Sequence, residues 1–171
     1  RRVRPIDVDA VLLSHLHPDH CADLYAYQVA LAHGPDRRAA PLPIFGPART
    51  AERIAALGQA DPLAAVAAPA AGGSPRPPLM DVGDLARAIE EPLRLGPFVV
   101  RVARMAHPVT TFGIRVEVPG GPSLAYSGDT GPSAALVDLA SGADALLCEA
   151  SFIPEAPSPP GLHLDGRQAG Q

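Results

Sequence analysis

The sequence predicts a mixed α/β (α+β) chain. Short apolar runs rich in β-branched residues are interleaved with segments whose apolar residues have helical spacing. Polar side chains gather directly after several of the predicted strands, and catalytic residues often lie on loops at the ends of scaffold strands. The first observation predicts the fold class, and the second indicates a site on the loops at the ends of strands.

The first half of the chain predicts two strands and two helices. Residues 10–13 form a continuous apolar run, which is typical of a strand buried on both faces, and residues 42–46 predict a second strand. Helical spacing predicts helices over 22–32 and 48–57. Residues 59–78 are rich in Ala, Pro and Gly without periodicity, which predicts a long loop.

The second half predicts more strands than helices. Strands are expected over 98–105, 112–118, 123–126 and 143–148, the last of them buried. The sequence Pro-Gly-Gly-Pro at 119–122 predicts a hairpin turn. The remaining elements are a short helix or turn over 83–91, a helix over 132–140 and a Pro-rich loop over 154–161.

Composition excludes several classes of protein. Apolar residues make up 47% of the 171 residues, enough for a core. The net charge is −4 and the fourteen basic residues, all Arg, are scattered, unlike the basic stripe of a dedicated nucleic-acid binder. Two cysteines without a Cys-x-x-Cys pair indicate a reducing cytoplasm. No run approaches the ~20 apolar residues of a membrane span, so no membrane partner is expected.

Residues 14–20, Ser-His-Leu-His-Pro-Asp-His, contain three of the six histidines of the chain. His15 and His17 are two apart in an extended segment, so both rings can reach one cation at the Zn–N distance of ~2.0–2.1 Å. Pro18 turns the chain, which lets Asp19 and His20 face a second cation. The alternative is a polar loop without a metal, but so dense a cluster has few structural reasons to exist.

Further ligands must come from distant segments, because a catalytic zinc has three protein ligands and an open position. His107 follows the predicted strand 98–105, and Asp129 follows the predicted strand 123–126 in Ser-Gly-Asp-Thr-Gly. The two oxygens of Asp129 can bridge two cations, and a hydroxide between cations ~3.5–4 Å apart is a strong nucleophile at neutral pH. The alternatives are an Asx-turn for Asp129 and a structural role for His107.

Four sequences in this order, SHLHPDH, AHPVTTFG, YSGDTG and CEASF, resemble the metallo-β-lactamase superfamily. Within it, the chain resembles the branch of ribonuclease Z-like hydrolases and related cyclic-nucleotide phosphodiesterases, over nearly all of residues 6–171. The resemblance implies a four-layer αββα sandwich with two divalent metal ions at one edge of the sheets. Zinc is the first choice, with Mn or Fe as alternatives. The implied ligands are His15, His17 and His107 for the first ion, Asp19 and His20 for the second, and Asp129 for both.

The resemblance also implies three catalytic residues. His163 matches a histidine that assists the leaving group or stabilises the transition state, with a surface position as the alternative. Glu149 is expected at the site too, where it can hold a histidine by a hydrogen bond. Asp19 is expected to be catalytic as well as a ligand. Cys148 stands where members of this branch often carry His, and we leave it out of the site.

The resemblance predicts a single metallo-β-lactamase-like domain over 1–171 that is partial at both ends. The family has two further strands before the equivalent of residue 1 and one more His ligand beyond residue 171. The chain begins with Arg and stops just inside a predicted helix start. One hypothesis is therefore a truncated fragment that binds metal weakly and does not catalyse.

The other two hypotheses are enzymes with different phosphodiester substrates. Transfer-RNA-processing members of the ribonuclease Z type carry a long basic arm between the equivalents of His107 and Asp129. Here these residues are 22 apart, and Arg115 is the only basic residue between them. This favours a phosphodiesterase that acts on a small substrate such as a cyclic nucleotide through a metal-bridging hydroxide. A tRNA 3′ endonuclease is the alternative, and a homodimer is expected from the resemblance.

Overall fold

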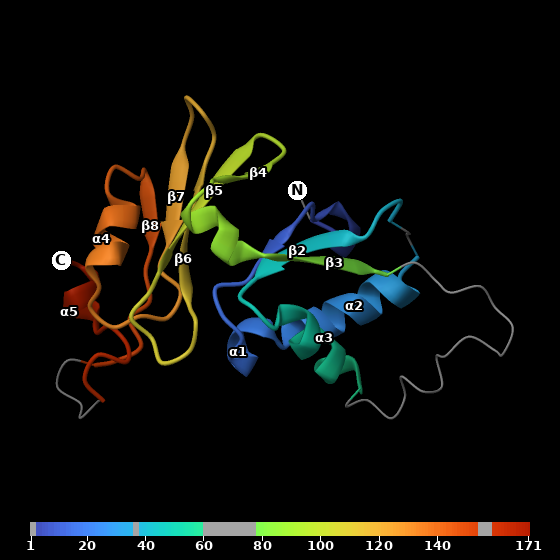
Figure 1. The fold of residues 1–171 in the computed structure, drawn as a ribbon, viewed down its shortest axis with the longest axis horizontal. Coiled ribbons are helices and arrows are strands. Elements are labelled where there is room, and N and C mark those ends of the chain that lie inside the picture. The colour runs from blue at the N-terminus through green and yellow to red at the C-terminus, as the bar shows by residue number, and fades with distance from the viewer. Residues whose placement is uncertain (1–2, 36–37, 60–77, 154–158) are drawn as a thin grey trace, which may run out of the picture. The chain divides into compact units, whose positions relative to one another are not determined.

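The computed structural model describes residues 3–35, 38–59, 78–153 and 159–171 (Figure 1). The chain divides into two compact units, Arg1–Gly83 and Asp84–Gln171. Each unit holds one β-sheet accompanied by helices, which confirms the predicted mixed α/β class. The single-domain arrangement over 1–171 stays a prediction.

The first unit is built on a three-stranded sheet. Its strands are β1 (Val11–Leu12), β2 (Leu42–Gly46) and β3 (Met80–Asp84), in the order β1-β2-β3. The first two are parallel, with Val11 opposite Ile44. Strand β2 has the predicted bounds, whereas β3 was not predicted, because the sequence Met-Asp-Val-Gly-Asp has neither a β-branched run nor an alternating pattern.

Helices complete the first unit. They are the 3₁₀ turn η1 (Pro5–Asp7), α1 (Pro18–Cys21), α2 (Asp23–His33) and α3 (Thr50–Gln59), and the last two confirm the predicted helices. Leu24 and Leu31 are two turns apart on α2, so they share a face. They pack with Leu42 and Ile44, which alternate along β2, and all four are buried in one core cluster.

The second unit is built on a five-stranded sheet. Its strands are β4 (Leu93–Leu95), β5 (Phe98–Arg104), β6 (Phe112–Glu117), β7 (Ser123–Tyr126) and β8 (Ala145–Leu147), in sequence order across the sheet. The first four strands are antiparallel neighbours, and β8 is parallel to β7. The predicted hairpin turn is present, since Val118 N–H donates to the Pro122 carbonyl and Gly120 has a φ of 73°.

The helices of the second unit are the 3₁₀ helix η2 (Leu85–Ile89), α4 (Ala134–Ala140) and α5 (Gly166–Ala169). Leu136 of α4 packs with Met105 and Leu164 in a second core cluster. Arg115 of β6 donates to the Leu139 carbonyl at 3.1 Å and to two further carbonyls just past the end of α4, which satisfies the free C-terminal acceptors of that helix. No helix in the described part of the chain is long and apolar enough to cross a membrane.

The predicted burial of two strands is wrong. Strand β1 is half-buried and β8 is exposed, with Leu147 59% exposed. Among the residues that the structure describes, each lies at the end of its sheet and has a strand neighbour on one side only. An apolar sequence therefore identified the strand but not its position in the sheet. The loops predicted over 59–78 and 154–161 fall largely outside the described residues.

Asp144 provides a testable link between pH and the stability of the second unit. Its Oδ2 accepts hydrogen bonds from Ser123 Oγ at 2.8 Å and Ser123 N–H at 2.7 Å, which joins the segment before β8 to the start of β7. These bonds, led by the one from the Ser123 hydroxyl, lower the pKa of Asp144 below 3.8. A depressed folded pKa stabilises the folded state above the unfolded pKa, and that stability is lost as the pH falls through the folded pKa.

We therefore predict that Asp144→Asn lowers the urea midpoint of unfolding at pH 7. The difference between the variant and the wild type should shrink as the pH falls below 3.8. Urea titrations followed by circular dichroism at several pH values test this. A difference that is the same at every pH would contradict the role of the Asp144 charge.

Candidate metal centre

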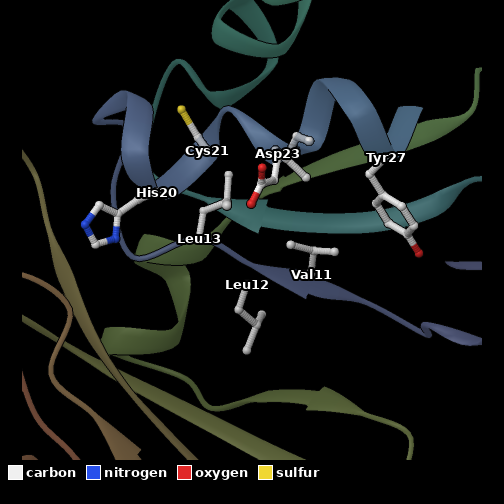
Figure 2. Close-up of a pocket in the computed structure, with 8 residues that line it drawn as sticks. Val11, Leu12, Leu13, His20, Cys21, Asp23 and Tyr27 are labelled. Atoms are coloured by element: carbon white, nitrogen blue, oxygen red, sulfur yellow. The ribbon is translucent and has the colours of Figure 1, made fainter. Parts of the chain in front are cut away.

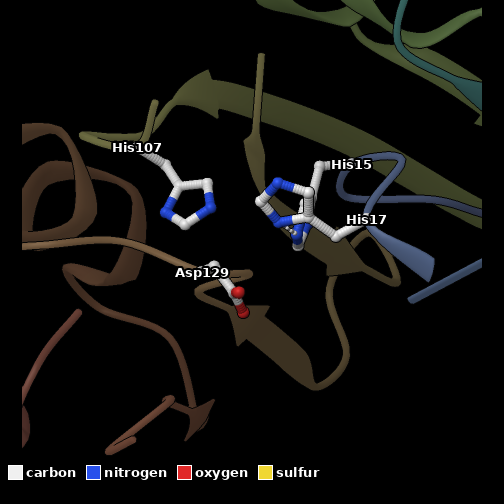
Figure 3. Close-up of side chains that lie close together, drawn as sticks. All are labelled: His15, His17, His107 and Asp129. Carbon is white, nitrogen blue, oxygen red and sulfur yellow. Dashed lines mark hydrogen bonds between the residues drawn. The ribbon is translucent and has the colours of Figure 1, made fainter. Parts of the chain in front are cut away.

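The first group of candidate ligands lies on the loop that follows β1. His15 is fully buried, and its Nδ1 lies 3.1 Å from Ser14 Oγ. Its Nε2 lies 3.1 Å from His17 Nδ1, and the two rings meet edge to face with centroids 4.8 Å apart (Figure 3). The spacing of two residues thus brings both imidazoles to one point.

This pair of rings fits a shared cation. Two nitrogens that each lie ~2.05 Å from a tetrahedral zinc ion are about 3.3 Å apart. The observed 3.1 Å between His15 Nε2 and His17 Nδ1 is close to that value. A hydrogen bond between the two rings would give the same distance. The remaining donor atoms therefore decide between a shared cation and a hydrogen bond. Imidazoles combined with carboxylates suit Zn, Mn or Fe.

Asp19 and His20 lie on α1, one turn further along. His17 is the extended N-cap residue of this helix, and Pro18 takes the first helical position, where its fixed φ is favourable. The His20 ring lies beside the His15 ring, with centroids 4.1 Å apart. Asp19 Oδ2 lies 3.4 Å from His20 Nε2, and the Asp19 side chain is 76% exposed. The loop therefore places His20 next to His15, and Asp19 at the surface beside His20.

A pocket of about 320 Å³ borders this loop (Figure 2). Its apolar wall includes Val11 and Leu13 of the β1 segment and Leu24 of α2, and His20 forms part of its polar edge. Tyr27 also lines it, while its hydroxyl donates to the Pro5 carbonyl. Tyr27 therefore both lines the pocket and connects α2 to η1.

The second group of candidate residues lies at one edge of the five-stranded sheet. Strands β5 and β7 both run antiparallel to β6, and β8 runs parallel to β7. Strands β5, β7 and β8 therefore end at the same edge. His107 follows the first of them, Asp129 the second and Glu149 the third. The strand directions thus bring together three residues that are far apart in the sequence.

A hydrogen bond sets the orientation of His107. Its Nδ1 lies 3.2 Å from the Leu162 carbonyl, which can only accept, so Nδ1 carries the proton. Nε2 is then the nitrogen with a lone pair, which is the form in which a neutral histidine binds a metal. A ring nitrogen of His107 lies within 4.8 Å of an Asp129 carboxylate oxygen (Figure 3).

Glu149 holds His163 in place. Its Oε1 accepts from His163 Nδ1 at 3.1 Å and from the backbone N–H of Thr130, and its Oε2 accepts from Ser151 Oγ at 2.9 Å. His163 Nδ1 also lies 3.9 Å from Asp129 Oδ2. The donor atoms of Asp129, Glu149 and His163 all lie within 4.8 Å of one another. This arrangement can handle a proton or contribute to a metal site.

Two hydroxyl side chains that the sequence analysis missed connect these loops. Thr130 Oγ1 accepts from Ala106 N–H at 3.2 Å, and Ser127 Oγ accepts from Glu149 N–H at 2.9 Å. Both hydroxyls are fully buried. Their position on either side of Asp129, in Ser-Gly-Asp-Thr, was the signal that could have identified them.

Cys148 directly precedes Glu149, but its environment does not favour metal binding. The side chain is half-buried and packs against the core cluster of Met105, Leu136 and Leu164. Burial raises the pKa of the Cys148 thiol, which keeps it protonated at neutral pH. Only the thiolate is a good metal ligand or nucleophile.

Sequence comparisons identify relatives over most of the chain. The family model of the beta-lactamase superfamily domain matches residues 1–171. The uncharacterized protein Rv1339 of Mycobacterium tuberculosis is 40% identical over 161 residues, which cover 94% of this chain and 55% of that protein. Ribonuclease Z of Mycobacterium bovis is 37% identical over 156 residues, which cover 82% of this chain and 50% of that enzyme. The chain thus spans about half the length of these curated relatives.

A solved structure shows the same fold. The metallo-β-lactamase fold protein YhfI from Bacillus subtilis matches with a TM-score of 0.74 and 24% identity, over 97% of this chain and 60% of that one. By sequence, the probable metallo-hydrolase YhfI of that organism is 26% identical over 168 residues, which cover 96% of this chain and 60% of that protein. The fold and the family expected from the sequence motifs are both confirmed. The chain belongs to the beta-lactamase superfamily, with the metallo-β-lactamase fold and with relatives in the ribonuclease Z-like branch.

Proposed function

We propose that the protein is a metal-dependent phosphodiesterase that hydrolyses a small phosphodiester such as a cyclic nucleotide. The observation that carries the proposal is the pair formed by the buried His15 and the half-buried His17, whose nitrogens are 3.1 Å apart in a chain of the beta-lactamase superfamily. When bound, two divalent cations, zinc in the first instance, would supply Lewis acidity toward water and toward the phosphoryl group. The proposed ligands are His15, His17, Asp19, His20, His107 and Asp129.

Hydrogen bonds to the rings support this ligand set. Ser14 contacts the Nδ1 of His15, and the Leu162 carbonyl accepts from the Nδ1 of His107. Such contacts fix the orientation of a ligand ring before the cation arrives, so that less conformational freedom is lost on binding. Asp19 is proposed as the ligand beside His20 and as a carboxylate that orients the attacking water.

His163 and Glu149 are proposed to manage the proton that the leaving group needs. A histidine that donates from Nδ1 to a carboxylate can take up and release a proton at Nε2. His163 has this arrangement, with Glu149 Oε1 at 3.1 Å. Glu149 is itself held by the Thr130 N–H and the Ser151 hydroxyl, so it presents a fixed acceptor to the ring.

The hairpin between His107 and Asp129 supports a small substrate. Its one basic residue, Arg115, donates to carbonyls at the end of α4 and lies 3.4 Å from a Glu117 carboxylate oxygen. The guanidinium is thus engaged within the fold. A protein that neutralises several RNA phosphates needs a corresponding number of accessible Lys or Arg side chains, and residues 108–128, all described, offer none beyond Arg115.

A tRNA 3′ endonuclease of the ribonuclease Z type is the second candidate. The observation in its favour is the 37% identity to ribonuclease Z of Mycobacterium bovis. Both candidates break a phosphodiester bond and can use the same ligands. Substrate comparison with the full-length protein therefore distinguishes them.

The first experiment compares Asp129→Asn with the wild type. The substitution keeps the size of the side chain but removes the charge, so it should lower cyclic AMP hydrolysis with added Zn or Mn by more than about 100-fold, since even partners of metal ligands contribute 10- to 100-fold. Metal content should fall in parallel. Asp138→Asn, an exposed position on α4 of the same unit, is the control that should retain activity.

The wild type decides between the two candidate functions. Turnover of cyclic AMP that Asp129→Asn abolishes supports the small-substrate proposal. A folded, metal-loaded wild type that ignores cyclic nucleotides but cleaves precursor tRNA would replace it with the second candidate.

The second experiment tests the pair Glu149 and His163. Glu149→Gln keeps the shape but weakens the acceptor of the His163 Nδ1 bond, so kcat should fall about 10- to 100-fold while metal content is unchanged. His163→Asn should cost a similar factor, and the double variant should lose little more, because the two residues act as one unit. Loss of metal in Glu149→Gln would instead identify Glu149 as a ligand, and additive effects would exclude a shared role.

A further inference from the structure

Thr130 joins two of the loops that carry proposed ligands. Its side chain is fully buried. Its hydroxyl accepts from Ala106 N–H at 3.2 Å and donates to the Gly131 carbonyl at 2.7 Å. Ala106 directly precedes His107, and Thr130 directly follows Asp129. One hydroxyl group therefore connects the neighbours of both proposed ligands.

The backbone adds a second connection between the same two loops. Gly131 N–H donates to the Ala106 carbonyl at 2.8 Å. The N–H and the carbonyl of Ala106 are thus both bonded to the Thr130–Gly131 segment, which restrains the two loops against sliding and against rotation. The Thr130 hydroxyl makes one of these two hydrogen bonds, and that bond is the one that a side-chain substitution can remove.

Two more loops meet the same segment. The backbone N–H of Thr130 donates to Glu149 Oε1. A Cβ atom on Gly131 would lie 2.1 Å from the Gly161 carbonyl oxygen, so the loop that leads to His163 packs directly on the Gly131 backbone. The segment is thus in contact with every loop of the second unit that carries a proposed site residue.

We propose that Thr130 is a positioning residue whose hydroxyl sets the separation of His107 and Asp129, and thereby the cation affinity and the turnover of the enzyme. This rests on the proposed function, in which both residues are metal ligands. Without the hydroxyl, the Ala106 N–H loses the acceptor that the buried Thr130 side chain supplies, and the loop can shift toward another acceptor. The shift would displace His107, because the two residues share a peptide bond.

The test uses two variants of this residue in the full-length protein. Thr130→Val keeps the shape of the side chain and the backbone N–H that donates to Glu149, but it removes the hydroxyl. Thr130→Ser keeps the hydroxyl. Zinc affinity from titration against a chromogenic chelator and kcat for cyclic AMP should both fall about 10- to 100-fold in the valine variant. The serine variant should recover both to within about threefold.

A control separates positioning from general stability. Thr50 is also buried, and its hydroxyl donates to the Pro47 carbonyl in the first unit. Thr50→Val should lower the unfolding midpoint but leave zinc affinity and kcat unchanged. A structural role alone would make Thr130→Val and Thr50→Val behave alike.

A readout without metal completes the design. Hydrogen exchange of the Ala106 amide in the metal-free protein should accelerate in Thr130→Val and return to the wild-type rate in Thr130→Ser. Wild-type zinc affinity in the valine variant would overturn the inference, as would a serine variant as impaired as the valine one. If the wild type binds zinc but hydrolyses no phosphodiester, the proposed function fails, and the zinc affinities still decide the role of Thr130. A wild type that binds no zinc overturns both.

Discussion

The common direction of β5, β7 and β8 is the constraint on which the second unit's candidate site depends. Two antiparallel steps from β5 to β7 and one parallel step to β8 end all three strands at one edge. The first and last of the residues at this site, His107 and Glu149, are more than forty residues apart in the sequence. Only this arrangement of the strands brings them to the same end of the sheet as Asp129. A reversed β8 would leave the Asp129 loop intact but place Glu149 at the opposite edge.

Loops at the ends of strands leave the regular hydrogen-bond ladder, so their backbone groups need other partners. Here side-chain hydroxyls and one carboxylate supply them. Ser127 accepts from the Glu149 N–H, Thr130 accepts from the Ala106 N–H, and Glu149 accepts from the Thr130 N–H. The same groups that satisfy the backbone therefore also orient the proposed catalytic residues, which ties the stability of these loops to the geometry of the site.

The features of the fold and of the candidate site that depend on local sequence signals could be predicted from the sequence. The strands at 42–46 and 123–126 and the His15–His17 pairing depend on spacings of a few residues. Strand β4 was missed because three residues carry too little periodicity, and the exposure of β8 was missed because an apolar run does not reveal which strands end a sheet. The hydrogen bond from Ala106 to Thr130 spans 24 residues and follows only from the register of β5, β6 and β7.

The two groups of proposed ligands differ in how they couple metal binding to folding. His15 and His17 are two residues apart, so an unfolded chain can present both to one cation. His107 and Asp129 are brought within 4.8 Å only when the sheet of the second unit has formed. A cation that binds the folded state alone stabilises it, whereas affinity for the unfolded chain reduces that gain. The stabilisation that a bound metal would give should therefore come mainly from the proposed ligands of the second unit, where strand register and not sequence proximity sets the geometry.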